Sequence, residues 1–315
     1  MIDRISTSSA YSSVLANLMQ AEVAETNAGT LLSTSETASD LQGYGVDAET
    51  LTAMQATTTQ VTGYLNNTQT VAAKLSTQDS ALGEVASAAT SAVTAITQTL
   101  ASTDGSGLMT SLQDALSSAV DGLNTTFNGA YLFSGGQVNT PSTSASTMAD
   151  LTAAPSVSSL FNNDQTVSST QLNANTSVST GFLASDVGGP LFTALQAIAA
   201  YNQGPNGPFT GTLTSAQSTF LSGQIANLDT VQTNLNNVVA QNGLAQSEVT
   251  SVQGQLTSQQ TMLQNLVGDI TTPNLAQAST NLQQAQLSIE AAGQVFQALN
   301  NSSLLGTLSA VPSIA

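Results

Sequence analysis

The most constraining feature of this sequence is a seven-residue repeat of apolar side chains between residues 228 and 270. Positions three and four residues apart form a seam over six heptads, which predicts a helix that packs along a partner helix for its whole length. At 1.5 Å per residue, such a helix is a rod of about 65 Å, too long to fold back on itself. The seam positions are Leu228, Val231, Leu235, Val238, Asn242, Ala245, Val249, Val252, Leu256, Gln259, Leu263, Leu266 and Ile270.

The same spacing occurs at both ends of the chain. Near the start, a polar residue, Glu25, interrupts an otherwise apolar or small seam, and we expect one helix there. Near the end, Pro273 breaks the long rod, because proline lacks an N–H donor and biases the residue before it away from helix. A last helix follows, with large residues at one seam position and mostly alanine at the other: Leu275, Leu282, Ile289 and Phe296, then Ala278, Ala285, Ala292 and Leu299.

Between these ends, the pattern predicts two more helices and an irregular insert. Apolar positions from Leu51 to Leu100 indicate a second long helix, which Gly105 and Gly107 end. A third stripe runs from Leu112 to Phe127.

The insert, residues 128–215, is rich in Gly, Pro, Asn, Ser and Thr. Short apolar alternations at residues 166–172 and 177–183 predict strands, and Pro190 is expected to open a short helix. Thr214 and Gln217 have the spacing of a capping box, so the long C-terminal rod should start there.

Charge excludes two classes of partner. The chain has 19 acidic residues against two basic ones, a net charge of −17, so it cannot neutralise phosphates. Nucleic acids and anionic membranes are therefore not expected partners. No run of 18 apolar residues is present, and Met1–Ser6 does not resemble a cleavable secretory signal.

Catalytic and metal chemistry are not expected either. The chain has no His and no Cys, which excludes a Ser-His-Asp triad, a thiolate nucleophile and the common zinc sites. Ser76 near Lys74 could form a Ser-Lys pair, but a solvated helix face is the simpler interpretation. The closest carboxylate pairs, Asp47 with Glu49 and Asp79 with Glu84, lack a pocket signature. We predict no catalytic residue, cofactor or metal site.

Asn242 is a polar residue on the apolar seam, and two interpretations stay open. A buried amide can determine the register of a coiled coil at a cost in stability. Alternatively, Asn242 and Gly243 begin a helix break. On the first interpretation, Asn242→Leu should stabilise the helix but disturb assembly.

Several motifs, taken together in their order along the chain, resemble the bacterial flagellin family. The resemblance covers residues 1–135 and 220–308 and depends on Ile5-Ser6-Thr7, the stretch 51–100, Asn128-Gly129 before Tyr131-Leu132-Phe133, Gly243 in a heptad rod, Asp269-Ile270 followed by Ala276, and Leu282 with Gln286. It implies an axial structural protein that leaves the cell through the flagellar export apparatus, without a cleaved signal peptide, and polymerises outside. Its expected partners are further copies of itself, hook-associated and cap proteins, the export apparatus and a secretion chaperone.

Two roles within the family compete. Residues 131–136 and the N-terminal residues 4–7 resemble the hook-filament junction protein. Residues 298–305 instead resemble the C-terminal end of a filament flagellin. The interpretation favours filament flagellin, with the junction protein as the alternative. A secreted coiled-coil effector or translocator is a rival from another class.

The predicted fold is mainly α, with long antiparallel coiled-coil helices from both termini and a smaller irregular α+β insert. Its expected parts are an N-terminal core helix (1–40), an N-terminal rod (41–135), a variable surface insert (136–219), a C-terminal rod (220–270) and a C-terminal core helix (271–315). The apolar tail should be buried by neighbouring copies, although a flexible end is an open alternative. The residues expected to contact other subunits are Leu18, Leu32, Leu275, Leu282, Ile289, Phe296, Leu299, Leu304 and Leu305.

Overall fold

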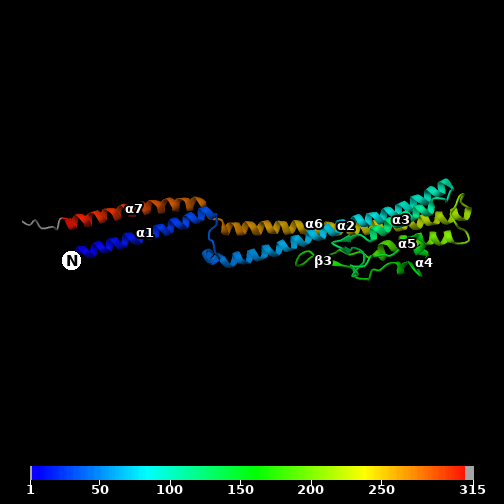
Figure 1. Cartoon of the computed structure of the whole chain (residues 1–315), viewed down its shortest axis with the longest axis horizontal. Helices are drawn as coiled ribbons and strands as arrows, with labels where there is room; N and C mark the ends of the chain where they lie inside the picture. Colours follow the sequence, from blue (N-terminus) through cyan, green and yellow to red (C-terminus); the bar gives the residue numbers. More distant parts are fainter. Residues whose placement is uncertain (1, 309–315) are drawn as a thin grey trace, which may run out of the picture. The chain divides into compact units, whose positions relative to one another are not determined.

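The computed structural model describes residues 2–308, with side chains described for residues 9–301. It confirms a mainly α fold with long helices from both ends and a small insert that contains two two-stranded sheets (Figure 1). The helices are α1 (Ile2–Thr34), α2 (Ala48–Ser102), α3 (Leu108–Leu123), α4 (Met148–Ala153), α5 (Ala184–Gln203), α6 (Ser215–Thr271) and α7 (Leu275–Leu308), with 3-10 turns η1 (Leu41–Asp47) and η2 (Val157–Leu160). The strands are β1 (Thr126–Phe127), β2 (Ala130–Tyr131), β3 (Ser169–Gln171) and β4 (Ser177–Ser179).

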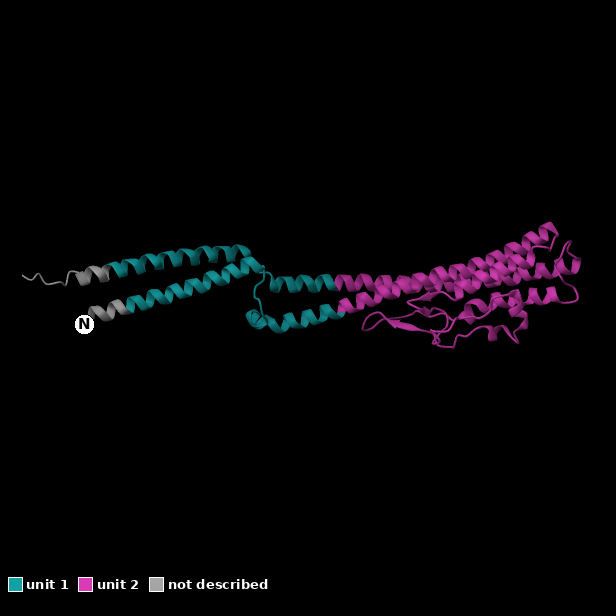
Figure 2. Ribbon diagram, viewed as in Figure 1, with its two compact units in different colours: residues 1–60, 260–315 teal, residues 61–259 magenta. Residues whose placement is uncertain are grey.

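The chain divides into two compact units, which are described separately (Figure 2). Unit 1 comprises residues 1–60 and 260–315, and unit 2 comprises residues 61–259. Both long helices α2 and α6 contribute residues to each unit.

In unit 1, α1 and α7 pack as an antiparallel pair. The rings of Tyr11 and Phe296 are 5.5 Å apart, and further along Gln286 Nε2 donates to Glu25 Oε1 at 3.3 Å. This hydrogen bond gives Glu25, the polar seam residue, a partner on the facing helix. Next to the pair, Thr37 N donates to Thr271 O at 2.8 Å.

The predicted break between the last two helices is confirmed. Helix α6 ends at Thr271 and α7 begins at Leu275, where Asn274 Oδ1 accepts from Gln277 N at 3.1 Å. This bond satisfies one of the free N–H groups at the start of α7, as expected for an N-cap asparagine.

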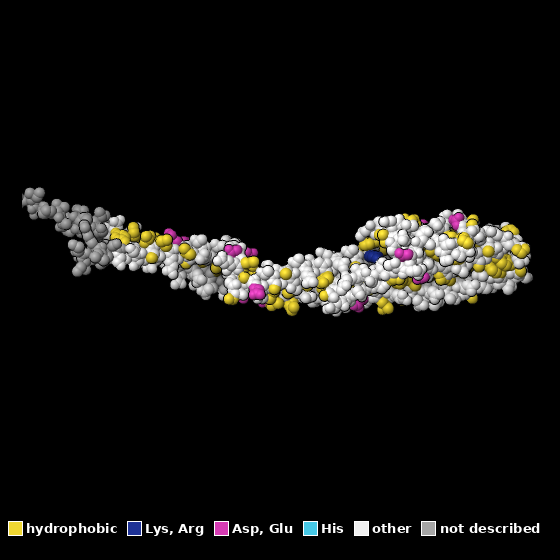
Figure 3. Space-filling model, turned by 90° about the horizontal axis from the view of Figure 1, so that it is seen from below, with side chains coloured by type: hydrophobic (Ala, Val, Ile, Leu, Met, Phe, Trp, Pro, Cys, Tyr) yellow, Lys and Arg dark blue, Asp and Glu magenta, His cyan; other side chains and the backbone are white. Residues whose placement is uncertain are grey.

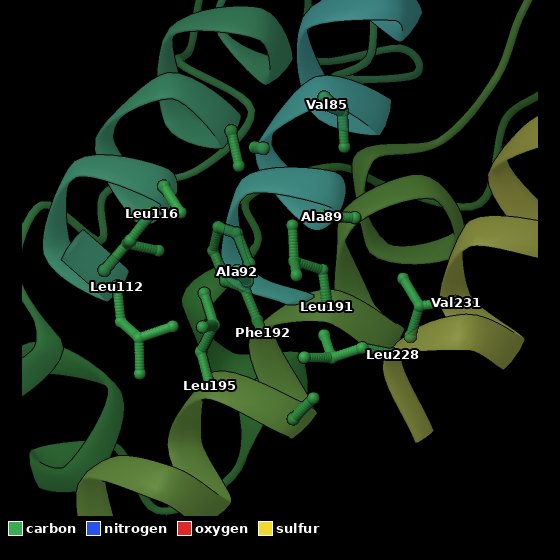
Figure 4. Packing of buried hydrophobic residues seen from close by; sticks show 14 of the residues in the cluster. Val85, Ala89, Ala92, Leu112, Leu116, Leu191, Phe192, Leu195, Leu228 and Val231 are labelled. Atoms are coloured by element: carbon green, nitrogen blue, oxygen red, sulfur yellow. The ribbon is translucent and has the colours of Figure 1, made fainter. Parts of the chain in front are cut away.

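In unit 2, α6 packs antiparallel to α2. Gln232 donates to Thr90, whereas Asn242, later in α6, donates to the carbonyl of Leu75, earlier in α2. The core is formed by alanines of α2 that face leucines and a phenylalanine of α3, α5 and α6 (Figure 4). Small side chains on one helix allow close approach of the others.

The seam of α6 keeps one of its two positions inward along the whole predicted stretch, with Leu256 and Leu263 buried and Ile270 half-buried, but its other position changes after Leu256. Gln259 is exposed and Leu266 is 39% exposed, whereas Gln260 and Val267 are half-buried. Beyond Leu256, the predicted register therefore holds at one of the two seam positions of each heptad and moves by one residue at the other. An α-helix has 3.6 residues per turn, so a 3.5-residue pattern drifts around a straight helix.

Three polar residues occupy buried seam positions of α2 that the apolar pattern did not predict. They are Thr68, Gln78 and Thr99, with exposed fractions of 0, 0 and 6%. They complete a heptad seam from Val61 to Thr99, so polar residues occupy some positions of a regular seam.

The third helix is shorter than predicted, because a hairpin replaces its last turn. Helix α3 ends at Leu123, and β1 pairs with β2 through Asn128 and Gly129, which have φ angles of 51° and 81°. Asn-Gly with two positive φ angles is the preferred two-residue hairpin turn. The sequence therefore contained the signal, but the apolar spacing through Phe127 obscured it.

Within the insert, the predicted strands are confirmed as β3 and β4, and the Thr214–Gln217 capping box is present at the start of α6. Helix α5 begins at Ala184 rather than at Pro190, because Ala184, Val187 and Leu191 are all buried in the core and favour helix across the proline. Helix α4 was not predicted, although Thr147 and Asp150 form a capping box at its start.

Candidate subunit contact surface

The structure does not assemble the Ser-Lys pair considered from the sequence. Lys74 Nζ lies 3.4 Å from Thr180 Oγ1, on the insert side of α2, and its partial burial lowers the pKa of the ammonium group by desolvation. Lys74 therefore helps to hold the β3–β4 hairpin against α2.

Acidic side chains of the insert stabilise backbone turns. Asp164 Oδ1 accepts from Gly136 N and Thr166 N, both at 2.8 Å, and these hydrogen bonds hold the pKa of Asp164 below its usual value. A Cβ at Gly135, where φ is +65°, would lie 2.3 Å from Asp164 Oδ1. Gly135 and Gly136 therefore leave room for the Asp164 carboxylate to bind the backbone of this turn.

Over the described side chains, residues 9–301, no three His, Cys, Asp or Glu residues gather where a metal ion could bind. Likewise, none of the helices within residues 2–308 combines the length and hydropathy needed to cross a bilayer. The features of interest are therefore the helix surfaces.

The predicted contact residues lie along α1 and α7, and the two helices bring them together in unit 1. Leu275 and Phe296 are 43% and 45% exposed. The side chains of Leu304 and Leu305 lie outside the described residues, as does the whole extension Val311–Ala315. The half-buried members of the set are Leu18, Leu32, Leu282, Ile289 and Leu299.

The buried positions of this helical pair are all alanines among the described side chains: Ala21, Ala28, Ala278 and Ala285. Each large seam residue packs against one neighbouring helix and remains partly open to water on its other side. The two helices therefore pack closely through alanines, and their large apolar side chains stay partly or mostly exposed.

A second apolar stripe faces outward, and the heptad count did not include it. Leu15, Met19 and Val23 are four residues apart on α1 and are 53%, 59% and 59% exposed. We call these three residues the α1 stripe. On α7, Leu287 and Val295 are 66% and 48% exposed. The i, i+4, i+8 spacing on α1 was the sequence signal for this face.

Between α1 and α7 lies a hollow of about 810 Å³, which we call the alanine groove. Hydrophobic side chains also reach the surface along this helical pair (Figure 3). The groove is lined by Val14, Asn17, Gln20, Ala21, Ala24, Asn27, Ala28, Leu31, Asn281, Gln284, Ala285, Ser288, Ala291, Ala292 and Val295. None of these lining residues is charged.

In unit 2, the interpretation of Asn242 as a helix break is wrong, because α6 is continuous through Gly243. Asn242 is fully buried, and its Nδ2 donates to Leu75 O at 3.0 Å and to Asp79 Oδ1 at 3.2 Å. Its Oδ1 has no hydrogen-bond partner, and neither polar atom of the buried Gln78 has one. This part of the rod therefore contains buried amide groups that cost stability.

Comparison with known proteins identifies the N-terminal part of the chain. Residues 5–140 match the family model of the bacterial flagellin N-terminal helical region. No curated protein matches the sequence.

Two solved structures share the fold. A protein described as a flagellar hook-associated protein from Vibrio parahaemolyticus is 15% identical, with a TM-score of 0.58 over 71% of this chain and 97% of that one. FlgL of Bacillus cereus is 13% identical, with a TM-score of 0.51 over 69% of this chain and 98% of that one.

Proposed function

We propose, because residues 5–140 match the family model of the bacterial flagellin N-terminal helical region, that this chain belongs to the bacterial flagellin family and is an axial structural subunit of the bacterial flagellum. In this role it acts outside the cell and performs no catalysis. The parts of the chain then have the roles expected from the sequence: helical regions from both ends for assembly and residues 136–219 as a surface-exposed insert.

The observation that carries this proposal is the uncovered apolar surface of the α1–α7 pair. Large side chains on both helices, such as Met19 and Leu287, are more than half exposed, while the buried residues of the pair within residues 9–301 are alanines. Burial of apolar surface contributes about 25 cal/mol per Å², so neighbouring copies that cover these helices stabilise them substantially. Two of the predicted contact residues, Leu275 and Phe296, are exposed members of this surface.

Within the flagellum, the hook-associated role is better supported than the filament role. The solved structure that aligns over 97% of its own length is described as a hook-associated protein, and residues 131–136 resemble the junction protein in sequence. We therefore propose a subunit at the junction of hook and filament, which reverses the preference drawn from the sequence. Filament flagellin is the second candidate, supported by residues 298–305.

The partners in this proposal are further copies of the chain, other hook-associated and cap proteins, the flagellar export apparatus and a secretion chaperone. Nucleic acid and membrane are not among them, in keeping with the net charge of −17.

Immunogold labelling of intact flagella tests the role. The source cells should be compared with a strain that lacks the gene and with the same strain after complementation. We expect label confined to one short zone near the hook and loss of attached filaments in the deletion strain. Label along the whole filament would support filament flagellin instead, and label that is absent from flagella would overturn both roles.

Limited proteolysis separates an axial subunit from a secreted coiled-coil effector. A broad-specificity protease is needed, because trypsin would find only Arg4 and Lys74. In the isolated chain, we expect cleavage of α1 and α7 before unit 2, and protection of both helices in assembled flagella. A secreted coiled-coil effector would instead stay monomeric at high concentration, and its α1 and α7 would resist cleavage as well as unit 2 does.

A further inference from the structure

We infer that the α1 stripe of one copy docks into the alanine groove of the next copy. This contact rests on the proposed function, because it names the surface through which neighbouring copies meet. Three observations carry it: the chemistry of the groove, the match of the stripe to the groove, and their positions around α1.

The groove has the chemistry of a site for an uncharged helix. Its lining includes small side chains, among them Ala24, Ala28 and Ser288, and the amides of Asn17, Gln20, Asn27, Asn281 and Gln284. A basic partner would be expected to seek carboxylates on a chain of net charge −17, yet the lining contains none. The occupant should therefore be apolar rather than basic.

The α1 stripe fits this description. Its three side chains project from one helix face over about 12 Å, while the groove extends along α1 from Val14 to Leu31, about 25 Å. The acidic residue beside the stripe, Glu22, is exposed. In the docked arrangement it would meet amide donors of the groove lining, which contains no carboxylate, so a second copy is a chemically matched occupant.

The stripe and the groove occupy different sides of α1. Met19, the centre of the stripe, and Ala24, at the centre of the groove face, are five residues apart, which is about 140° around the helix axis. None of the three stripe residues lines the groove. One copy can therefore dock its stripe into one neighbour and receive the stripe of another. Such a heterologous contact generates rings or open helical rows rather than closed dimers.

Disulfide crosslinking tests the contact, because the natural chain has no cysteine. Met19→Cys and Ser288→Cys are prepared as full-length chains with different affinity tags, mixed at high concentration and oxidised. We expect the mixed-tag dimer in roughly tenfold excess over same-tag dimers, since the contact is heterologous. The double variant should give a ladder of dimers, trimers and larger species.

Two matched controls establish the site. Met19→Cys mixed with Ala53→Cys, an exposed position outside the groove lining, should give only background crosslinking. Ala24→Trp, added to the Ser288→Cys chain, should fill the groove and abolish the mixed-tag product, whereas Ala53→Trp on that chain should not.

Other outcomes overturn the inference. Mixed-tag product no stronger than the Ala53→Cys background would show that the stripe does not enter the groove. Dominant Met19–Met19 dimers would show a symmetric stripe contact instead. If these results accompany immunogold label on flagella, the contact is wrong and the proposed function stands; if the mixed-tag dimer forms but no flagellar label is seen, the contact stands and the proposed function fails.

Discussion

Both compact units contain amphipathic helices, but they differ in which side chains those helices bury. In unit 2, leucines and phenylalanines such as Leu116 and Phe192 are completely buried, and residues of α2, α3, α5 and α6 cover them (Figure 4). In the α1–α7 pair of unit 1, the buried residues among the described side chains are alanines, and the large side chains keep contact with water.

The difference shows that helix length alone does not produce a core. Two helices side by side cover only one face of each other, and helices in proteins gain most of their stability from tertiary packing. Unit 2 is therefore expected to be stable in a single chain, and the α1–α7 pair to depend on neighbours.

The largest expected effect comes from removing a ring in unit 2. Phe192 is fully buried and its ring lies 5.1 Å from that of Phe161, so Phe192→Ala should lower the free energy of unfolding by about 3–5 kcal/mol. Phe296→Ala in unit 1 should cost about 1 kcal/mol, because that ring is half exposed and contacts mainly Tyr11. Urea denaturation followed by circular dichroism measures both. Equal losses would refute the contrast.

Adding one methyl group at a glycine should have opposite effects in the two units. A Cβ at Gly122 would lie 2.9 Å from Ala81 O and 3.0 Å from Val85 Cγ2, so Gly122→Ala should destabilise unit 2 by about 1–3 kcal/mol. Nothing lies within 4 Å of a Cβ at Gly29, so Gly29→Ala should stabilise α1 by about 0.5–1 kcal/mol. Amide hydrogen exchange resolves the two regions, and a destabilised α1 would contradict the prediction.

Asn242→Leu should raise the stability of unit 2 by about 1 kcal/mol. The substitution removes a buried carbonyl oxygen without a partner, which outweighs the loss of two hydrogen bonds. The hydrogen bonds from Asn242 to α2 no longer determine the register between α2 and α6, so assembly is expected to become less regular. Asn236→Leu, at an exposed position of the same helix, is the control for stability. A lower urea midpoint for Asn242→Leu would show that its hydrogen bonds dominate.

The smallest expected effect is a loss of stability of the insert at acidic pH. The pKa of Asp164 is lowered in the folded chain by hydrogen bonds from Gly136 and Thr166, so its contribution is present above the ordinary pKa of 3.8 and disappears as the pH falls through the lowered value. Asp164→Asn should therefore be less stable than the natural chain at pH 7 and nearly equal to it at strongly acidic pH. A difference that persists at acidic pH would indicate a role independent of charge.

Much of the fold could be predicted from local patterns. Heptad spacing identified the long helices, and short signals such as Thr214 with Gln217 and the Pro273 break located helix ends. The hairpin at Asn128-Gly129 and helix α4 had local signals that apolar spacing obscured. The candidate site was predicted only in outline, because sequence spacing shows which positions of α1 are apolar but not which of them remain uncovered.

By itself, the sequence determined that this protein has long paired helices, an irregular insert, and no His or Cys for the common catalytic and zinc sites. It could do so because amphipathic periodicity and turn chemistry act within a few residues along the chain. Only the tertiary structure decided that Thr68, Gln78 and Asn242 are buried, and that Leu15, Met19 and Val23 face solvent on a different side of α1 from the alanine groove. Burial depends on how many neighbouring elements cover a residue, and those neighbours come from distant parts of the chain.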